Sequence, residues 1–429
     1  MLKAIRTVLL TLLCLAFTAL VSAAPLRVAL VEQQSTVEIS CDDDFVVRDA
    51  VTGKEETVPK GKYFLHVQQG KLCLEDGRVY SNDIIINALP EKMLPKVNKK
   101  EYFGSLRALL RQDKILLNNI VDVDSYLSCV LPEKTMPVWP DETIKAQAVA
   151  GRSYCLYMQA ANSHRDYDLS ANDDEFTYRG CGKRINKDAV TKLIAAVKGQ
   201  YLVDNTGRYV NAVSTSSSGG KTESAMNAWN KKFSYLQSVK DYDNDSPDYK
   251  WEYQASPTLV ENLLEQRGYK VGKLSSVKLS PIDSMGDDRT ATGRVKHIFF
   301  TGSAGTVKVS GAQLVEILNL NSALFDIETG TPIPEVLKVP IENAYGFEIG
   351  SKNINIKVNE SEQPVWKDIM RSYHMLSGAK GEKITFRGSG KGHGVGLSAW
   401  GARGLANTDD SITYVDILKH YYPGTRLIK

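Results

Sequence analysis

Histidine and cysteine are both scarce in this chain of 429 residues. There are 6 histidines and 6 cysteines, and no two cysteines stand in a CxxC pair. This scarcity argues against a zinc ribbon, which needs four such ligands at short spacings. The formal net charge is only +3, which is too small to predict a nucleic-acid partner. We therefore predict no metal, no cofactor and no nucleic acid.

The spacing of a nucleotide-binding motif is also missing. Gly219-Gly220-Lys221-Thr222 resembles the end of a P-loop, but Thr215 stands where the first glycine of that motif belongs. The glycines around His393 never satisfy the GxGxxG pattern either. Neither segment predicts a phosphate-binding loop.

Long apolar runs are absent except at the start of the chain. An apolar run of about 14 residues extends from Val8 to Val21, short of the roughly 20 that span a bilayer. Lys3 and Arg6 precede it, and small residues follow it. This pattern predicts a signal peptide over residues 1–23, with an uncleaved anchor as the alternative. We expect an exported protein of the periplasm or cell wall that has no membrane span after cleavage.

Cysteine pairing cannot be read from the sequence. Export makes disulfides possible, but an odd number of five cysteines remains after cleavage, with none close to another. We expect at least one of them to be free or buried as a small apolar residue. They are Cys41, Cys73, Cys129, Cys155 and Cys181.

The pattern of short β-branched segments and amphipathic segments predicts an α+β fold. We expect a strand-rich N-terminal domain over 25–118, then a mixed α/β core over 119–255 with a central helix that begins near Pro140. A smaller inserted α+β lobe follows over 256–330, where Ser310 and Gln313 fit a capping box. Residues 331–429 complete the core and contain a final helix over about 411–421.

Five glycines alternate with single residues near the C-terminus, and His393 lies among them. They are Gly388, Gly390, Gly392, Gly394 and Gly396. A period of two is the period of a strand, so one interpretation is a strand with one bare face that a ligand or another backbone approaches closely. The alternative is an irregular glycine-rich turn.

Four segments carry the motifs that remain. They are Leu131–Pro140 leading into Ile144–Tyr154, Ser216–Ser224, Lys391–Ser398 with Trp400–Ala402, and His420–Thr425. In this order, over roughly residues 119–429, they resemble the stage II sporulation protein D / LytB (SpoIID/LytB) family. The resemblance implies a function on peptidoglycan. Some members of that family are lytic transglycosylases that cut peptide-free glycan strands, and others are enhancers of cell-wall amidases.

A lytic transglycosylase needs one carboxylic acid of raised pKa to protonate the bond between N-acetylmuramic acid and N-acetylglucosamine. The family pattern places this acid in Val-Pro-any-Glu-Met, before Trp-Pro. Here Lys134 occupies the acid's position and Glu133 stands one residue early. Two interpretations stay open: Glu133 serves as the acid, or the acid is lost. Glu142 is a possible substitute that helix capping explains better.

The resemblance also implies residues that bind the glycan. Lys145, Gln147 and Arg152 match the family helix, and the hydroxyls of Ser216, Ser217 and Ser218 with nearby free amides are suited to sugar hydroxyls. Glu223, His393 and Trp400 complete the list of candidate glycan-binding residues. For these segments the alternatives are an exposed basic stripe, a flexible loop and a structural histidine. We expect Lys145, Ser217 and His393 to line one shared surface.

Other departures from the family remove its metal site. Ser170, Asp174 and Glu175 stand where Cys, His and Cys would be, so we again predict no zinc. Two hypotheses result. The first is a lytic transglycosylase that uses Glu133. The second is a non-catalytic protein that binds glycan strands or enhances a cell-wall amidase.

Overall fold

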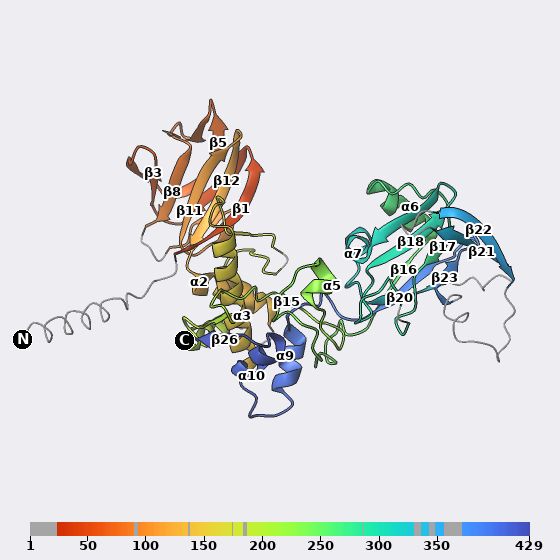
Figure 1. Ribbon diagram of the computed structural model, residues 1–429. Helices are drawn as coiled ribbons and strands as arrows, with labels where there is room; N and C mark the ends of the chain where they lie inside the picture. The colour runs from red at the N-terminus through yellow and green to blue at the C-terminus, as the bar shows by residue number, and fades with distance from the viewer. Residues whose placement is uncertain are drawn as a thin grey trace, which may run out of the picture. The chain divides into compact units, whose positions relative to one another are not determined.

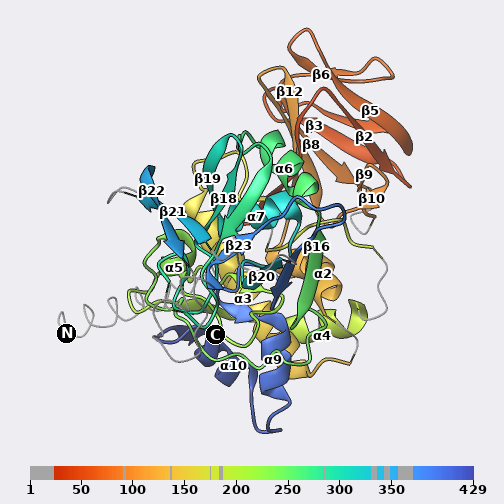
Figure 2. The same cartoon turned by 90° about the vertical axis from the view of Figure 1, so that its right-hand side faces the viewer.

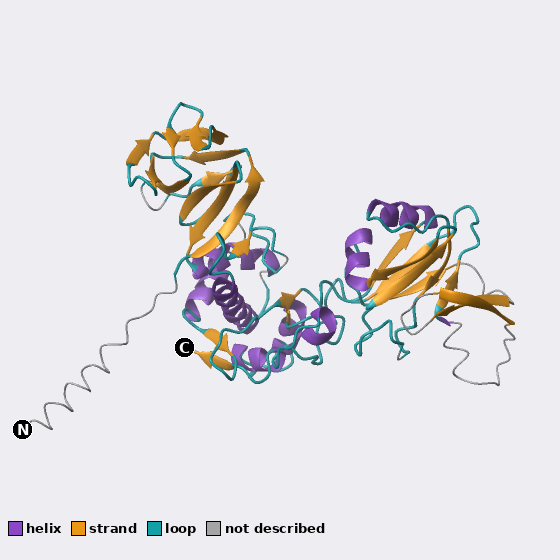
Figure 3. Ribbon diagram, turned by 45° about the horizontal axis from the view of Figure 1, so that its top comes forward, coloured by secondary structure: helices purple, strands orange, loops and turns teal. Residues whose placement is uncertain are grey.

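The computed structural model describes residues 24–89, 93–135, 138–173, 175–182, 187–284, 286–329, 336–342, 348–355 and 371–429. The predicted signal peptide lies outside these residues. The described chain is a mixed α+β protein, as predicted (Figure 3). It divides into two compact units, residues 1–129 with 158–182 and residues 130–157 with 183–429.

The first unit is built from two sheets (Figures 1 and 2). One has the order β13-β1-β12-β11-β8-β3-β4 and the other β10-β9-β2-β5-β6-β7. The strands are β1 (Leu26–Gln34), β2 (Thr36–Cys41), β3 (Phe45–Asp49), β4 (Glu55–Val58), β5 (Gly61–Gln68), β6 (Lys71–Leu74), β7 (Val79–Tyr80), β8 (Asp83–Ala88), β9 (Lys96–Val97), β10 (Lys100–Glu101), β11 (Ser105–Arg111), β12 (Lys114–Val121) and β13 (Leu169–Ser170). The predicted strand-rich region is confirmed.

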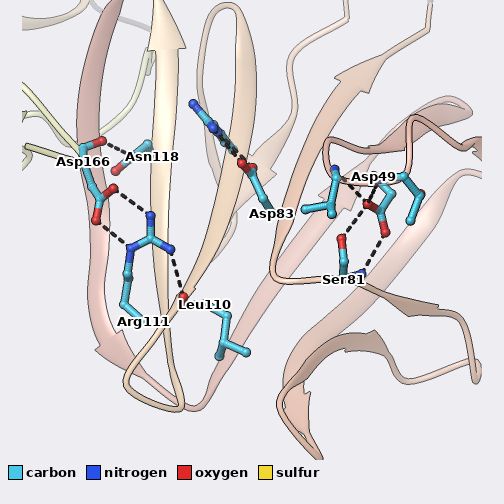
Figure 4. Close-up of polar contacts among 10 residues, drawn as sticks. Asp49, Ser81, Asp83, Leu110, Arg111, Asn118 and Asp166 are labelled. Carbon is cyan, nitrogen blue, oxygen red and sulfur yellow. Dashed lines mark hydrogen bonds and ion pairs between the residues drawn. The ribbon is translucent and has the colours of Figure 1, made fainter.

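Alternating burial explains these strands. In β8, Ile84 and Ile86 are buried while their neighbours are less so, which is the period of a half-buried strand. Polar contacts join the ends of strands to neighbouring loops (Figure 4). Arg111 forms two hydrogen bonds to Asp166, at 2.7 and 2.8 Å, and the Asp49 carboxylate accepts the Ser81 amide at 2.8 Å.

A disulfide between Cys129 and Cys181 joins two distant segments of the first unit. Cys41, Cys73 and Cys155 are buried and lie outside this disulfide. The prediction that at least one cysteine is free or buried is therefore confirmed. The pairing itself connects residues 52 positions apart, a separation that no sequence spacing indicated.

Two helices cross the division between the units. They are α2 (Val123–Lys134) and α3 (Asp141–Ala161). The predicted central helix is confirmed as α3, which carries Asp141 and Glu142 in its first turn, where negative charge suits the helix dipole. Thirteen residues of α3 are buried, from Thr143 to Leu156, so α3 is a core helix.

The second unit has short strands and helices around α3, and a lobe with its own core. Its elements are α4 (Lys187–Ala196), β14 (Tyr201–Val203), β15 (Ser214–Thr215), α5 (Ala225–Trp229), β16 (Trp251–Ala255), α6 (Pro257–Gln266), β17 (Leu274–Lys278), β18 (His297–Gly302), β19 (Gly305–Ser310), α7 (Gly311–Leu318), β20 (Phe325–Thr329), β21 (Val336–Glu342), β22 (Glu348–Asn355), β23 (Tyr373–Met375), β24 (Ile384–Gly388), β25 (Leu397–Ser398), α9 (Ala399–Ala406), α10 (Tyr414–Tyr421) and β26 (Arg426–Ile428).

The lobe combines the sheets β16-β24-β20 and β19-β18-β17-β23 with α6 and α7. Its core includes the fully buried Phe300, Phe325 and Phe386. The capping box predicted at Ser310 and Gln313 is confirmed at the start of α7. β24 lies between β16 and β20 in the lobe and ends at Gly388. The glycine-rich segment follows it directly in the chain.

The glycine segment is not a strand beyond β24. Gly390, Gly392, Gly394 and Gly396 all have positive φ, between 75° and 97°, which is outside the strand region. The interpretation of a continuous strand with a bare face is therefore wrong, and the irregular glycine-rich turn is correct. Glycine is required here because side chains rarely adopt this conformation.

Candidate functional site

The structure brings the four motif segments of the second unit into one hydrogen-bonded network. The Trp139 and Trp400 rings contact edge to face, with centroids 5.3 Å apart, and the Trp400 amide donates to the Ser216 carbonyl at 3.1 Å. The backbones of Ser217 and Lys391 pair in an isolated antiparallel β-bridge. From the last motif, the Tyr422 hydroxyl donates to the Val213 carbonyl at 2.8 Å. Residues dispersed over nearly three hundred positions therefore share one location.

The glycine segment allows this convergence, because the chain's own backbone occupies the space beside it. A Cβ at Gly390 would lie 2.7 Å from the Ser217 carbonyl oxygen, and one at Gly396 would lie 2.0 Å from that of Val213. Glycine often occurs where another backbone approaches closely. Here the approaching backbone is that of residues 213–219. These two glycines serve internal packing.

The serine hydroxyls point to buried aspartates. Ser217 Oγ donates to Asp243 and Ser218 Oγ to Asp241, each at 2.5 Å. The expected free amides are not free, because Gly219 N and Gly220 N donate to Asp243 at 2.7 and 2.9 Å. The reason is electrostatic: a carboxylate that is 0% exposed needs several donors to offset its lost hydration. Ser216 is half-buried.

Asp241 lies at the centre of a buried acidic cluster. Its Oδ1 accepts the Tyr421 hydroxyl at 2.6 Å and the Tyr242 amide at 2.9 Å. Burial raises the pKa of Asp241, and the nearby charge of Asp243 raises it further. Burial also raises the pKa of Tyr421 well above its usual value. This cluster joins the serine segment to α10, so it holds the network together.

Glu223 is buried and accepts three hydrogen bonds. Its Oε1 accepts the Ser224 amide at 2.8 Å and Asn227 Nδ2 at 2.9 Å, while its Oε2 accepts the Thr292 hydroxyl. A carboxylate saturated by donors in this way is suited to structural support rather than to donating a proton. It also lies beside the guanidinium of the buried Arg294, whose pKa is lowered to about 10 by burial despite the charge of Glu223.

His393 and Trp229 form an aromatic pair near the surface. Their ring centroids are 5.0 Å apart and the rings meet edge to face. His393 Nδ1 accepts the Val395 amide at 2.9 Å, so the neutral ring carries its proton on Nε2. Trp229 is 37% exposed and Met226, one turn earlier on α5, is 46% exposed. We call Met226, Trp229 and His393 the aromatic face.

The helix residues of the motif take different positions. Lys145 Nζ forms a 2.6 Å ion pair with Glu142, whose other oxygen accepts the Tyr414 amide at 2.7 Å. The hydrogen bond to Glu142 raises the pKa of Lys145. Arg152 is only 4% exposed and donates to the Val197 and Gln200 carbonyls. It is therefore no part of an exposed basic stripe.

Gln147 and Trp139 are buried, and one side-chain nitrogen of each has no hydrogen-bond partner among the residues that the structure describes. Gln147 is 6% exposed and Trp139 5%, and the atoms concerned are Gln147 Nε2 and Trp139 Nε1. Beside Trp139, the half-buried Trp400 also carries the Arg403 guanidinium over its ring at 5.3 Å. The Trp400 ring is thus enclosed on two sides by protein.

Glu133 lies in the last turn of α2. The segment is therefore helical there, and Pro132 lies inside the helix. Backbone placement is all that is described for Glu133. Met136 and Pro137 lie outside the described residues. The predicted role of Glu133 stays a prediction.

No group of three or more metal-ligating side chains occurs within the described ranges. Ser170 and Glu175 both belong to the first unit, and Asp174 is outside the described residues. Among the described helices, none has both the length and the apolar character needed to cross a bilayer.

The sequence comparisons agree with the motifs. Residues 111–203 match the family model described as stage II sporulation protein (SpoIID). The predicted resemblance is confirmed: the chain is similar to members of the SpoIID/LytB family.

Two curated relatives illustrate the relationship. The chain is 26% identical over 403 residues to the amidase enhancer of Bacillus subtilis (strain 168), which covers 91% of this chain and 52% of that protein. It therefore spans about half the length of that relative. It is also 26% identical over 318 residues to stage II sporulation protein D of Bacillus amyloliquefaciens, covering 71% of this chain and 73% of that protein.

Sequence reasoning missed several residues that organise this site. Asp241 and Asp243 collect the serine hydroxyls and glycine amides, and Arg294 packs against Gly394. Trp229 follows the serine segment by only a few residues, yet no motif includes it. A tryptophan soon after a glycine-rich segment was the one available signal, since tryptophan is enriched at binding interfaces.

Proposed function

We propose that this chain binds glycan strands of peptidoglycan through the aromatic face and acts as a non-catalytic binding protein or as an enhancer of a cell-wall amidase. Its family relationship supports a cell-wall-related role. The observation that carries the proposal is the exposed Trp229 against His393, at the point where the motif segments meet. Aromatic rings present flat apolar surfaces beside polar edges, which suits the faces and hydroxyls of a sugar.

The charge around the aromatic face agrees with this substrate. Lys231 and Lys232 follow Trp229 after Asn230 and are exposed, as is Lys221, which precedes α5 in the chain. Muramic acid carries an anionic lactyl carboxylate, which such cations attract. A sugar stacked on Trp229 would thus have ammonium groups within reach of its carboxylate.

The other candidate residues support the binding surface from within. Ser217, Ser218 and Glu223 are all 0% exposed, so we assign them to holding the surface in shape. Arg152 and Gln147 are buried in α3 and serve the same purpose. Within this proposal, Ser216, Trp400 and Lys145 remain at the edge of the surface because each is partly exposed.

A lytic transglycosylase is the second candidate. It is favoured by the position of Glu133, whose helical turn leads within a few residues to Trp139 and hence to Trp400. In that reaction Glu133 would protonate the glycosidic oxygen, and the muramic acid's own C6 hydroxyl would capture the anomeric carbon, leaving a 1,6-anhydro end. Only one acid is needed, whereas ordinary glycosidases use two carboxyl groups.

One experiment separates the two candidates. The full chain is incubated with peptide-free glycan strands, and binding is followed by co-sedimentation while mass spectrometry searches for 1,6-anhydro ends. Binding without such ends supports the non-catalytic proposal. Formation of 1,6-anhydro ends that Glu133→Gln abolishes and Glu142→Gln preserves would replace it with the transglycosylase. Absence of binding would overturn both.

The enhancer role has its own test. A purified cell-wall amidase is assayed on intact peptidoglycan with and without this chain. We expect the chain to raise the rate of amide hydrolysis, and Trp229→Ala to reduce that stimulation. An unchanged rate with wild-type chain would leave glycan binding as the function and remove the enhancer role.

A further inference from the structure

The first unit contains a cavity that none of the family motifs accounts for. It has a volume of about 180 Å³, far above the roughly 10–15 Å³ that one water molecule requires. Its lining includes the buried residues Val97 and Tyr102, which are 2% and 4% exposed. Its rim is polar and exposed. The exposed members of the rim include Asn98, Lys100, Asn172 and Arg179.

Two cations of the rim come from separate segments. Lys100 belongs to β10, which pairs with β9 through the tight turn at Asn98 and Lys99, both with positive φ. Arg179 precedes Gly180, whose φ is +90° and where a Cβ would lie 2.8 Å from the Glu101 carbonyl oxygen. The backbone geometry thus brings both residues to one cavity.

The cavity is held in place by contacts that do not use these cations. The Cys181 amide donates to the Glu101 carbonyl at 2.7 Å, and the disulfide ties Cys181 to Cys129. The Tyr178 hydroxyl donates to Asn119 Oδ1 at 3.0 Å. Tyr102 packs edge-on against Tyr178 with centroids 5.1 Å apart. A pocket with walls fixed in this way needs little reorganisation to bind a ligand.

Neither cation has an acidic partner in the described structure. Salt bridges of the neighbouring strands engage Lys96 with Asp42 and Glu101, at 2.6 and 3.5 Å, and none engages Lys100 or Arg179 there. The carboxylate nearest to Lys100 along the chain belongs to Glu101, which already pairs with Lys96. Two unpaired cations at a cavity whose lining also includes buried Val97 and Tyr102 and the amide side chains of Asn98 and Asn172 are complementary to a carboxylate on a small organic body.

We propose that this cavity is a binding site for a small carboxylate, with Lys100 and Arg179 pairing with the anion and Val97 and Tyr102 contacting its apolar part. This site is separate from the aromatic face and does not depend on the function proposed for it. Two cell-wall groups supply the same chemistry: the lactyl carboxylate of a muramic acid residue and the C-terminal carboxylate of a stem peptide.

Isothermal titration calorimetry on the full chain tests the proposal and distinguishes the two sources. N-acetylmuramic acid is compared with N-acetylglucosamine, which lacks the carboxylate, and D-alanyl-D-alanine with its C-terminal amide. We expect saturable binding of at least one carboxylate and at least tenfold weaker binding of its uncharged counterpart. Equal binding within each pair, or no binding of either carboxylate, would overturn the proposal.

Variants identify the location. Lys100→Gln combined with Arg179→Gln should weaken carboxylate binding at least tenfold, and Arg179→Lys should retain most of it. Lys71→Gln, an exposed lysine of the same unit, is the matched control and should bind as wild type does. Wild-type affinity in the double variant would contradict the assignment to this cavity.

Discussion

The buried guanidinium of Arg294 lies directly against Gly394, so that a Cβ on Gly394 would be 2.1 Å from Arg294 Nη2. Arg294 Nη2 in turn donates to the Ser218 carbonyl at 2.7 Å. Through this contact the inserted lobe, the serine segment and the glycine segment meet at one point. The glycine before Val395 is therefore a packing requirement of the site.

Gly394→Ala should destabilise the protein strongly for two reasons. Residue 394 has a positive φ of 77°, which alanine rarely adopts, and the new methyl group would collide with the buried side chain of Arg294. Gly424→Ala is the matched control, since Gly424 has φ of +78° and nothing within 4 Å of its added Cβ. We expect losses in the free energy of unfolding of about 3 kcal/mol and about 1 kcal/mol. Urea denaturation measures both. Equal losses would show that the contact with Arg294 is unimportant.

Arg152 and Lys145 should differ in their effect on stability, although both match the family helix. Arg152→Ala leaves the buried carbonyls of Val197 and Gln200 without these donors, which costs about 2–4 kcal/mol. Lys145→Ala removes a partly exposed ion pair worth at most about 1 kcal/mol. Thermal unfolding of the two variants is the measurement. A larger loss from Lys145→Ala would contradict the structural role assigned to Arg152.

The disulfide between Cys129 and Cys181 should contribute about 2–4 kcal/mol, because it closes a loop whose ends are 52 residues apart. We expect a reducing agent to lower the Tm of the wild-type protein. The double variant Cys129→Ser, Cys181→Ser should unfold at a lower temperature and be insensitive to the reducing agent. A wild-type Tm that does not respond to complete reduction would contradict this prediction.

Acid should remove a contribution from Asp204. The hydrogen bond from Thr206, together with backbone amides, lowers the pKa of Asp204 from 3.8 to about 2. Because the folded pKa is below the unfolded one, the stabilisation is present above about pH 4 and is lost as the pH falls toward 2. Asp204→Asn should flatten the fall in the free energy of unfolding over that range. A variant with the wild-type slope would show that Asp204 contributes nothing.

The sequence predicted those parts of the fold that depend on local patterns. The helix that became α3 was visible from the acidic residues after Pro140 and the spacing of its apolar positions. The capping box at Ser310 was visible from two residues, and β8 from its run of β-branched residues, Ile84 to Ile86. Each of these signals acts over one or two turns or one strand, so no tertiary information was needed.

The candidate site was predicted less completely because tertiary contacts decide the role of each residue. The motif positions of Ser217 and Ser218 were visible, but the aspartates that bind their hydroxyls lie more than twenty residues away. The alternating glycines suggested a strand. In the structure Gly390 and Gly396 instead have positive φ, and the backbone of residues 213–219 lies close against them. Trp229 belongs to no motif, and its place in the site follows from its contact with His393.

The most direct test of the central claim is the affinity for peptide-free glycan strands of Trp229→Ala beside Tyr209→Ala. Trp229 and Tyr209 are both 37% exposed aromatic residues of the second unit, so general surface effects are matched. We expect Trp229→Ala to weaken binding at least about tenfold, or ~1.4 kcal/mol, and Tyr209→Ala to bind as the wild type does. Equal affinity of both variants and the wild type would contradict glycan binding at the aromatic face.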